Sequence, residues 1–312
     1  MQPRLTLSWP GGGELPVTAL RLDRSLASPV GVAEAELSAL AAPPDPGAEV
    51  SLEAAVTGSP TKLLTGRVRL RAPGPRASRL LIEEPTGALA RVRIDRAYKS
   101  TTAGQVIRDL CGEAEAKTGM IEPGATLPAY AVTQEQTALD HVQRLCVASG
   151  LLLRTDSAGK LHAAMPLPVP AGLLKAPAAV LDWSVSEAPD LDTDVTITGD
   201  GAMGRKGPGA ENWVLADLSG ITSGSGGLLL QLPELKTAAD VAKAQTIAAQ
   251  LRKESAKTAA LTLADVPPAD LGEVIAIAGF GALDGAWRVT GIRVRWGVPT
   301  GFVCEISLAG VA

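Results

Sequence analysis

Few side chains in this sequence have the types and spacing that a catalytic or metal site requires. The chain has only two histidines, His141 and His162. His141 precedes Cys146 by five residues in an expected helix, which matches no zinc-binding spacing. No Gly-x-Ser-x-Gly motif is present, and two such isolated histidines do not assemble a Ser–His–Asp set. We therefore predict no enzyme, no catalytic residue, no cofactor and no metal.

Acidic and glycine-rich stretches give no stronger signal. Residues 190–194 alternate aspartates like the start of a calcium loop, but the required glycine and glutamate are misplaced. Glu83 and Glu84 are neighbours on an expected strand, so their side chains should point to opposite faces. The segments 201–208 and 224–227 do not fit a phosphate-binding loop: the first lacks the Gly-Lys-Ser/Thr ending, and neither joins a strand to a helix. We interpret the aspartates as a turn and the glycines as surface loops.

Composition narrows the class of protein further. The chain has 312 residues and 31.9 kDa, enough for two or three domains. Its net charge is −4 and its basic residues are dispersed, which disfavours sequence-specific binding to nucleic acid. The three cysteines, Cys111, Cys146 and Cys304, are odd in number and far apart, as expected of small buried side chains in a reducing compartment. No signal peptide opens the chain, and no apolar run is long and pure enough for membrane insertion. We expect synthesis in the cytoplasm.

An internal repeat positions most of the remaining residues. Residues 47–82 are echoed by residues 272–306, so Gly47 matches Gly272. The match slips by one residue where Val68 meets Ile292, which predicts a β-bulge in one copy. The sequence therefore predicts one β-rich unit that occurs twice.

The periodicity predicts a mainly β protein with an α+β insert. We expect a first β domain over 1–95, an α+β insertion domain over 96–166, a proline-rich connector over 167–179, and a second β domain over 180–312. Capping signals predict three helices, beginning at Thr102 with Gln105, at Thr133 with Gln136, and at Thr237. The first helix should end near residue 119 and the second at Gly150, and the third should span about 237–257.

Three stretches, in this order and spacing, resemble the baseplate hub proteins of contractile phage tails, including the late control protein D family and the hub half of type VI secretion spike proteins. They are Ala97-Tyr98-Lys99-Ser100-Thr101-Thr102; Tyr130-Ala131-Val132-Thr133-Gln134-Glu135-Gln136-Thr137-Ala138-Leu139-Asp140 with its continuation to Gly150-Leu151; and Leu271-Gly272-Glu273-Val274 with Gly285-Ala286-Trp287-Arg288-Val289.

The resemblance covers nearly the whole chain and implies a fold and a role. It implies two tail-tube-like β-barrel domains plus a small helix-hairpin insertion domain. It implies a homotrimer forming a pseudo-sixfold ring between a hexameric tail tube protein and a trimeric spike protein, in contact with other baseplate proteins such as wedge and tape measure proteins. The location would be the baseplate of a virion tail or injection system, after synthesis in the bacterial cytoplasm. Because the sequence ends at Ala312 directly after its last expected strand, we expect a separate spike protein.

Two alternatives remain open at this point. A distal tail protein of a non-contractile phage would share the barrel, and a tail-associated cell-surface hydrolase would need carboxylates that the sequence does not supply in a suitable arrangement. The candidate interface residues are arginines that alternate along the repeated strands: Arg67, Arg69, Arg71, Arg293 and Arg295. We predict that they occupy one face of equivalent strands, where they line either the lumen or the ring interfaces, or form a solvated outer face.

Overall fold

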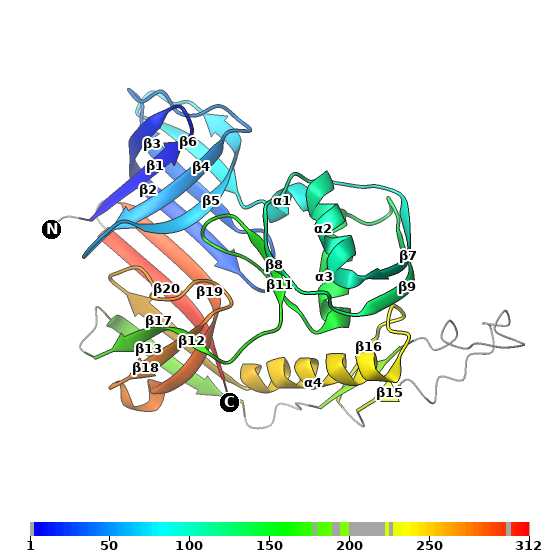
Figure 1. Ribbon diagram of the computed structural model, residues 1–312. Coiled ribbons are helices and arrows are strands. Elements are labelled where there is room, and N and C mark those ends of the chain that lie inside the picture. The colour runs from blue at the N-terminus through cyan, green and yellow to red at the C-terminus, as the bar shows by residue number, and fades with distance from the viewer. Residues whose placement is uncertain are drawn as a thin grey trace, which may run out of the picture.

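The computed structural model describes residues 3–176, 180–188, 194–199, 222–224, 227–297 and 301–311. Two groups of β-strands lie one above the other, and a helical insert lies beside them (Figure 1). A long helix, α4 (Ala238–Ser255), runs from the second group of strands beneath the insert.

The first group is a closed six-stranded barrel. Its strands follow the order β1-β4-β5-β6-β3-β2, and β2 pairs back to β1. Buried residues alternate with half-buried or exposed ones along β3, β4 and β6, because successive side chains point to opposite sides of a strand. The strands are β1 (Arg4–Trp9), β2 (Gly13–Ser25), β3 (Val32–Ser38), β4 (Glu49–Ala55), β5 (Thr61–Ala72) and β6 (Ala77–Glu83).

The second group has six strands in the corresponding order, β12-β18-β19-β20-β17-β13. Among the described residues, β12 and β13 are not paired with each other, so this barrel is open along one seam. A short 3-10 helix, η4 (Gly281–Leu283), precedes β19. The strands are β12 (Pro170–Lys175), β13 (Val180–Glu187), β17 (Lys257–Leu263), β18 (Val274–Ala278), β19 (Gly285–Gly297) and β20 (Gly301–Gly310).

The predicted repeat is confirmed and extends beyond the echoed segment. Strands β12, β13, β17, β18, β19 and β20 correspond in chain order to β1 to β6, with matching neighbours in the sheet. Gly47 and Gly272 occupy the same place: both have positive φ, and their N–H groups donate to Val68 and Val289 across the hairpin. One pairing differs, since β12 runs parallel to β18 whereas β1 runs antiparallel to β4.

The predicted register inside the repeat is wrong. Leu52 pairs with Leu64, whereas its equivalent Ile277 pairs with Gly285, so the first hairpin of the second copy is four residues shorter. The next hairpin is longer by five residues, because Val68 pairs with Ile82 and Val289 with Leu308. The two differences in hairpin length nearly cancel, so residues 47–82 and 272–306 align almost without gaps.

The bulge prediction also needs correction. Both copies carry a bulge, and it lies at the same place in each: between Val68 and Leu70 in β5 and between Val289 and Gly291 in β19. A bulge that is present in both copies belongs to the fold and leaves no slip in the sequence match.

A strand pair joins the two barrels. Residues 20–25 of β2 pair antiparallel with residues 291–296 of β19, so both barrels belong to one 12-stranded sheet. Leu26 also donates its N–H to Thr290 O at 2.9 Å. One hydrophobic core runs through both barrels and includes the fully buried Trp287, whose indole N–H donates to Leu283 O.

The insert has a core of its own. Strand β8 pairs with the hairpin β10–β11, strand β7 pairs with β9, and the helices pack between them. The predicted hairpin is present. The elements are α1 (Thr86–Leu89), β7 (Arg96–Thr102), α2 (Ala103–Glu113), β8 (Thr118–Ile121), β9 (Thr126–Val132), α3 (Ala138–Ser149), β10 (Leu152–Thr155) and β11 (Leu161–Ala164).

The helix boundaries confirm part of the prediction. Thr102 and Thr237 cap α2 and α4 as predicted. Helix α3 begins later than predicted: its capping box is Thr137 with Asp140, not Thr133 with Gln136. It ends as predicted at Gly150 in the left-handed conformation (φ 64°). Helix α2 stops at residue 113 because β8 follows, so the predicted end near residue 119 is wrong.

Two further elements lie outside the predicted pattern. Part of the predicted proline-rich connector is strand β12, which pairs with β18. A small sheet of β14 (Val195–Thr198), β15 (Thr222–Ser223) and β16 (Leu228–Gln231) packs on α4, and this third core also includes Ala125 and Ala148 of the insert. Helix α4 therefore connects the second barrel to the insert.

Candidate assembly surfaces

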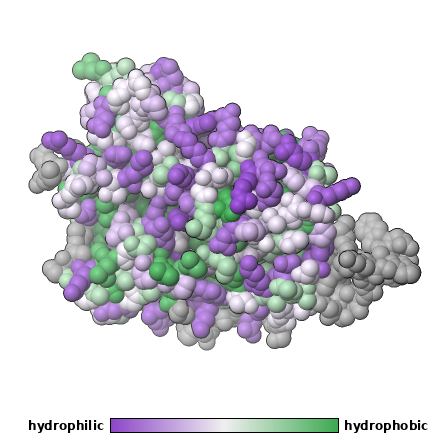
Figure 2. Space-filling model, in the orientation of Figure 1, coloured by the Kyte–Doolittle hydropathy of each residue, from purple (hydrophilic) through white to green (hydrophobic). Residues whose placement is uncertain are grey.

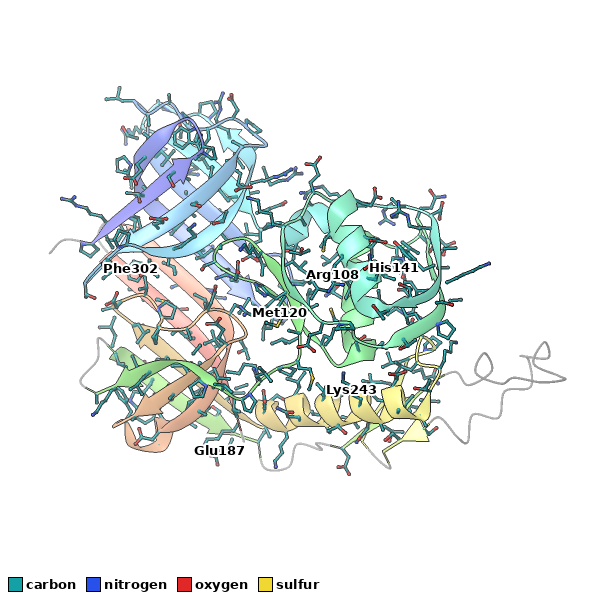
Figure 3. All side chains as sticks on the ribbon, in the orientation of Figure 1. Arg108, Met120, His141, Glu187, Lys243 and Phe302 are labelled. Carbon is teal, nitrogen blue, oxygen red and sulfur yellow. The ribbon has the colours of Figure 1, made fainter. Side chains whose placement is uncertain are left out.

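Both histidines make structural contacts inside the insert. His141 is buried, and its Nδ1 lies 2.9 Å from the hydroxyl of Tyr130 (Figure 3). His162 Nδ1 accepts the N–H of Met120, so its Nε2 carries the proton and donates to Asp156 at 2.9 Å. These bonds fix β8, β9 and the β10–β11 turn, and each ring nitrogen has a partner.

The other chemical candidates are also separated or buried. All three cysteines are free and buried, and burial raises the pKa of Cys111 and Cys304 to about 12. Glu83 binds Arg69 and Arg91, whereas Glu84 lies in the interior, as expected for adjacent residues on opposite faces. In the described part of the chain, no three His, Cys, Asp or Glu side chains gather as metal ligands, and no helix is long and apolar enough to cross a membrane. Most of the aspartate turn, and all or part of each glycine-rich segment, fall outside the described residues.

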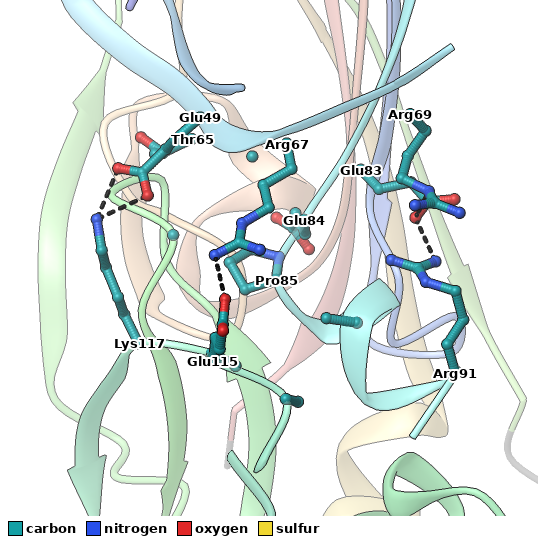
Figure 4. Close-up of a pocket in the computed structure, with 15 residues that line it drawn as sticks. Glu49, Thr65, Arg67, Arg69, Glu83, Glu84, Pro85, Arg91, Glu115 and Lys117 are labelled. Atoms are coloured by element: carbon teal, nitrogen blue, oxygen red, sulfur yellow. Dashed lines mark hydrogen bonds and ion pairs between the residues drawn. The ribbon is translucent and has the colours of Figure 1, made fainter. Parts of the chain in front are cut away.

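The arginines of β5 do not form one basic face. Arg67 binds Glu115, which lies two residues after α2, and Arg69 binds Glu83, which also binds Arg91 (Figure 4). Arg71 instead binds Asp45 in the preceding loop. The cause is the bulge after Val68, which changes the alternation of side chains along the strand.

The arginines of β19 do share a face, as predicted. Arg293 and Arg295 alternate with buried Ile292 and Val294. Arg293 lies between Asp23 of β2 and Glu305 of β20, at 3.1 and 3.5 Å. Each cation therefore has a carboxylate neighbour, and the outward face at the barrel joint carries mixed charge.

A buried arginine that the sequence did not reveal connects three parts of the chain. Arg24 of β2 is 2 % exposed and binds Glu84 and Asp270, each at 2.6 Å. Its third nitrogen donates to Thr155 O at 2.7 Å, in the hairpin of the insert. The side chain thus touches the first barrel, the insert and the segment before β18. We name this set of contacts the Arg24 clasp.

The second buried ion pair anchors helix α4. Arg288 of β19 binds Glu254, and both side chains are buried. Arg288 is the repeat equivalent of Arg67. Each arginine directly precedes the valine, Val289 or Val68, whose carbonyl accepts the hydrogen bond from Gly272 or Gly47. Both arginines bind a glutamate at the C-terminal end of a helix: Glu254 lies in the last turn of α4, and Glu115 lies two residues after α2. The repeat therefore uses one anchoring position twice.

Apolar side chains gather on the open seam of the second barrel. All residues of strand β13 are exposed or half-buried, and Leu181 and Trp183 on it are 59 % and 39 % exposed. Leu173 of the facing strand β12 and Leu167 before it are also exposed. Figure 2 shows hydrophobic residues over this barrel. The periodicity of the sequence gave no sign of this surface, because an exposed strand with apolar residues looks like a buried one.

Comparison with known proteins assigns the fold. No protein-family model matches the sequence, and a search of curated proteins finds no match. Among solved structures, the 43 kDa tail protein of prophage MuSo2 from Shewanella oneidensis is 17% identical with a TM-score of 0.71, covering 99% of this chain and 98% of that one. A tail protein from Neisseria meningitidis is 13% identical with a TM-score of 0.71, covering 99% and 97%.

A third similar structure comes from a secretion system. A protein from E. coli, described as a component of the type VI secretion system, is 12% identical with a TM-score of 0.64, covering 98% of this chain and 77% of that one. These likenesses extend over the whole chain. They confirm the predicted mainly β fold, and the chain has the fold of phage tail proteins and of this secretion component.

Proposed function

We propose that this protein is the structural baseplate hub of a contractile tail or a related injection apparatus. The observation that carries the proposal is the presence of two barrels with one strand order, joined edge to edge in a single chain. Tail proteins that match over their whole length support the same role. The division into two barrel domains, an insertion domain and a linking segment belongs to this proposal.

Symmetry explains why two barrels in one chain would be useful. Three copies contribute six barrels of similar shape, so a threefold ring presents a nearly sixfold outline. Such a ring joins a hexameric tail tube on one side to a trimeric spike on the other. Tube, spike and neighbouring baseplate proteins are the proposed partners, and the location is the baseplate.

The mixed-charge face around Arg293 and Arg295 is proposed to line the channel of this ring. The face continues from β20 through β19 to β2, and so crosses from one barrel to the other. Cations that are already paired to carboxylates give a hydrated wall of low net charge. Reversing the charges of Arg293 and Arg295 together should impair assembly, and unchanged trimers and tube attachment would contradict this role.

The mass of the purified protein, alone and mixed with its tube protein, tests the function. We expect a species of three copies, three times the 31.9 kDa of the chain, that associates with the tube protein. A monomer that never binds the tube protein would refute the hub. A distal tail protein is distinguished by attaching to tube proteins of a non-contractile tail, with no sheath gene beside its own.

A further inference from the structure

The pair of strands that joins the two barrels has an equivalent pair of strand edges elsewhere in the chain, and these edges are not paired with each other. Within the chain, β2 of the first barrel pairs with β19 of the second. The repeat makes β13 the equivalent of β2, and β5 the equivalent of β19. Each chain therefore carries a second copy of both halves of the joint, one on each barrel.

Both halves are free in the single chain. Strand β13 pairs with β17 alone among the described residues. Strand β5 is hydrogen-bonded on the β4 side as far as Val68, which bonds Gly47 and Ala48. Beyond Val68, it pairs only with β6 among the described residues. The corresponding end of β19 is the part that β2 covers. Unpaired strand edges are available for pairing with another chain.

We propose that these two edges pair between neighbouring copies, so that β13 of one chain docks on the end of β5 of the next. This inference rests on the proposed ring and specifies how its copies meet. The occupant is a second copy because the contact repeats one already made inside the chain. The contact is head-to-tail, and such contacts generate closed rings when the rotation between copies closes.

The internal joint sets the register of the proposed contact. Val17 and Val180 are equivalent because each lies just before a bulge at the same place, so Arg24 corresponds to Glu187 and Asp23 to Ser186. Inside the chain these β2 positions face Ile292 and Arg293, whose equivalents on β5 are Arg71 and Ala72. We therefore infer that Glu187 faces Arg71, and Ser186 faces Ala72, of the next copy.

Charge and exposure agree with this register. Glu187 lies at the outer edge of the second barrel (Figure 3), where its side chain is 64 % exposed and binds the exposed Lys257. Among the described residues, Arg71 binds the exposed Asp45 and a loop carbonyl. Opposite charges would thus meet across the contact. Leu70, at the start of the free β5 edge, is 56 % exposed and would become covered.

The tip of β5 limits how far backbone pairing can extend. Pro73 and Pro75 follow the strand and have no N–H to donate. The hydrogen-bonded part of the contact is therefore confined to residues 70–72. Beyond it, the register places Trp183 against Pro75, where the internal joint has Leu20 against Trp296. An aromatic ring and an apolar partner occur in both joints, on opposite strands.

Paired cysteines test the contact directly. Ala72→Cys combined with Ser186→Cys puts two exposed thiols on facing positions, and facing Cα atoms in an antiparallel pair are about 4.5–5.5 Å apart, within disulfide range. The native cysteines are buried. Mild oxidation of the full-length variant should give covalent species of two and three copies. The control pair, Ala72→Cys with Thr258→Cys on the adjacent strand β17, should stay monomeric on the same gel.

A charge exchange provides a second measurement. Arg71→Glu and Glu187→Arg should each weaken trimer formation, and the combined variant should recover it. Arg96→Glu, an exposed and ion-paired control in the insert, should have no effect.

The outcomes separate this contact from the hub itself. A trimer by mass that gives no 72–186 cross-link refutes the contact and leaves the hub standing. A cross-linked ladder that continues beyond three copies supports the contact and refutes the threefold ring. A protein that neither forms trimers nor cross-links refutes both.

Discussion

Removing the Arg24 side chain should destabilise the protein more than any surface change. In Arg24→Met, the carboxylate of Glu84 is 3 % exposed and keeps one hydrogen bond within the described part of the chain, from Gly31 N–H at 3.1 Å. The carboxylate of Asp270 loses a smaller part of its hydrogen bonding, because the N–H groups of Leu271 and Ser157 still donate to it. Leaving one buried charge without its partner costs about 3–5 kcal/mol, and we expect a loss of that size.

A double variant separates lost pairing from lost packing. Arg24→Met with Glu84→Leu removes both buried charges, so the loss should be no more than about half that of Arg24→Met alone. The matched control is Arg79→Met, whose exposed pair with Glu36 should contribute less than about 1 kcal/mol. Guanidinium unfolding followed by tryptophan fluorescence measures all three. Equal losses in the single and double variants would refute the reasoning.

The same residue predicts a dependence on pH. Burial raises the pKa of Glu84 above its ordinary 4.5, although Arg24 opposes the shift. A carboxyl with a raised folded pKa contributes stability fully below pH 4.5 and loses it as the pH rises through the folded value. Without Arg24 the pKa of Glu84 rises further. The loss of stability caused by Arg24→Met should therefore be largest at neutral pH and smaller at about pH 5. A penalty that is equal at both pH values would contradict this account.

Three other changes test local features. Thr137→Ala removes the cap of α3 and should cost about 1 kcal/mol by thermal unfolding. Hydrogen bonds from Thr137 lower the pKa of Asp140, so this cap should stabilise the fold above pH 3.8 and lose its effect as the pH falls through the lowered pKa. Gly150→Ala should cost about 1 kcal/mol or more, because the backbone is left-handed there and a Cβ would lie 2.5 Å from Ile247 Cδ1. Trp287→Ala should cost about 3–5 kcal/mol by the same denaturant assay, whereas an unchanged midpoint would contradict its place in the core.

The sequence predicts the structural features that depend on residues close together in the chain. The two copies of the β unit, the ends of α4 and the stop at Gly150 follow from alternation, capping and turn chemistry, and each is present. The register of the copies failed because one hairpin shortened by about as much as the next lengthened. The first shift, of four residues, is even and keeps inward and outward positions in phase, so the hydrophobic pattern alone does not reveal it.

The remaining features depend on distant contacts. Arg24 resembles any other basic residue on an alternating strand, and only the fold brings Glu84, Thr155 and Asp270 to it. Likewise, the prolines of 167–179 predict a connector, whereas Gly172 to Lys175 pair with the distant strand β18. Of the predicted interface residues, Arg293 and Arg295 share a face and the β5 arginines do not, because the bulge is invisible to a simple alternation.

The closed first barrel and the open second barrel differ in how soon their strands become available. All six strands of the first barrel lie within residues 4–83, so this barrel can close while the rest of the chain is still on the ribosome. The second barrel cannot, since β13 and β17 are separated by α4 and its small sheet, and β19 arrives almost last. When β19 leaves the ribosome, its partner strand β2 is already part of the folded first barrel. The joint between barrels can thus act as a template on which the later barrel is completed, and the order of synthesis favours that sequence of events.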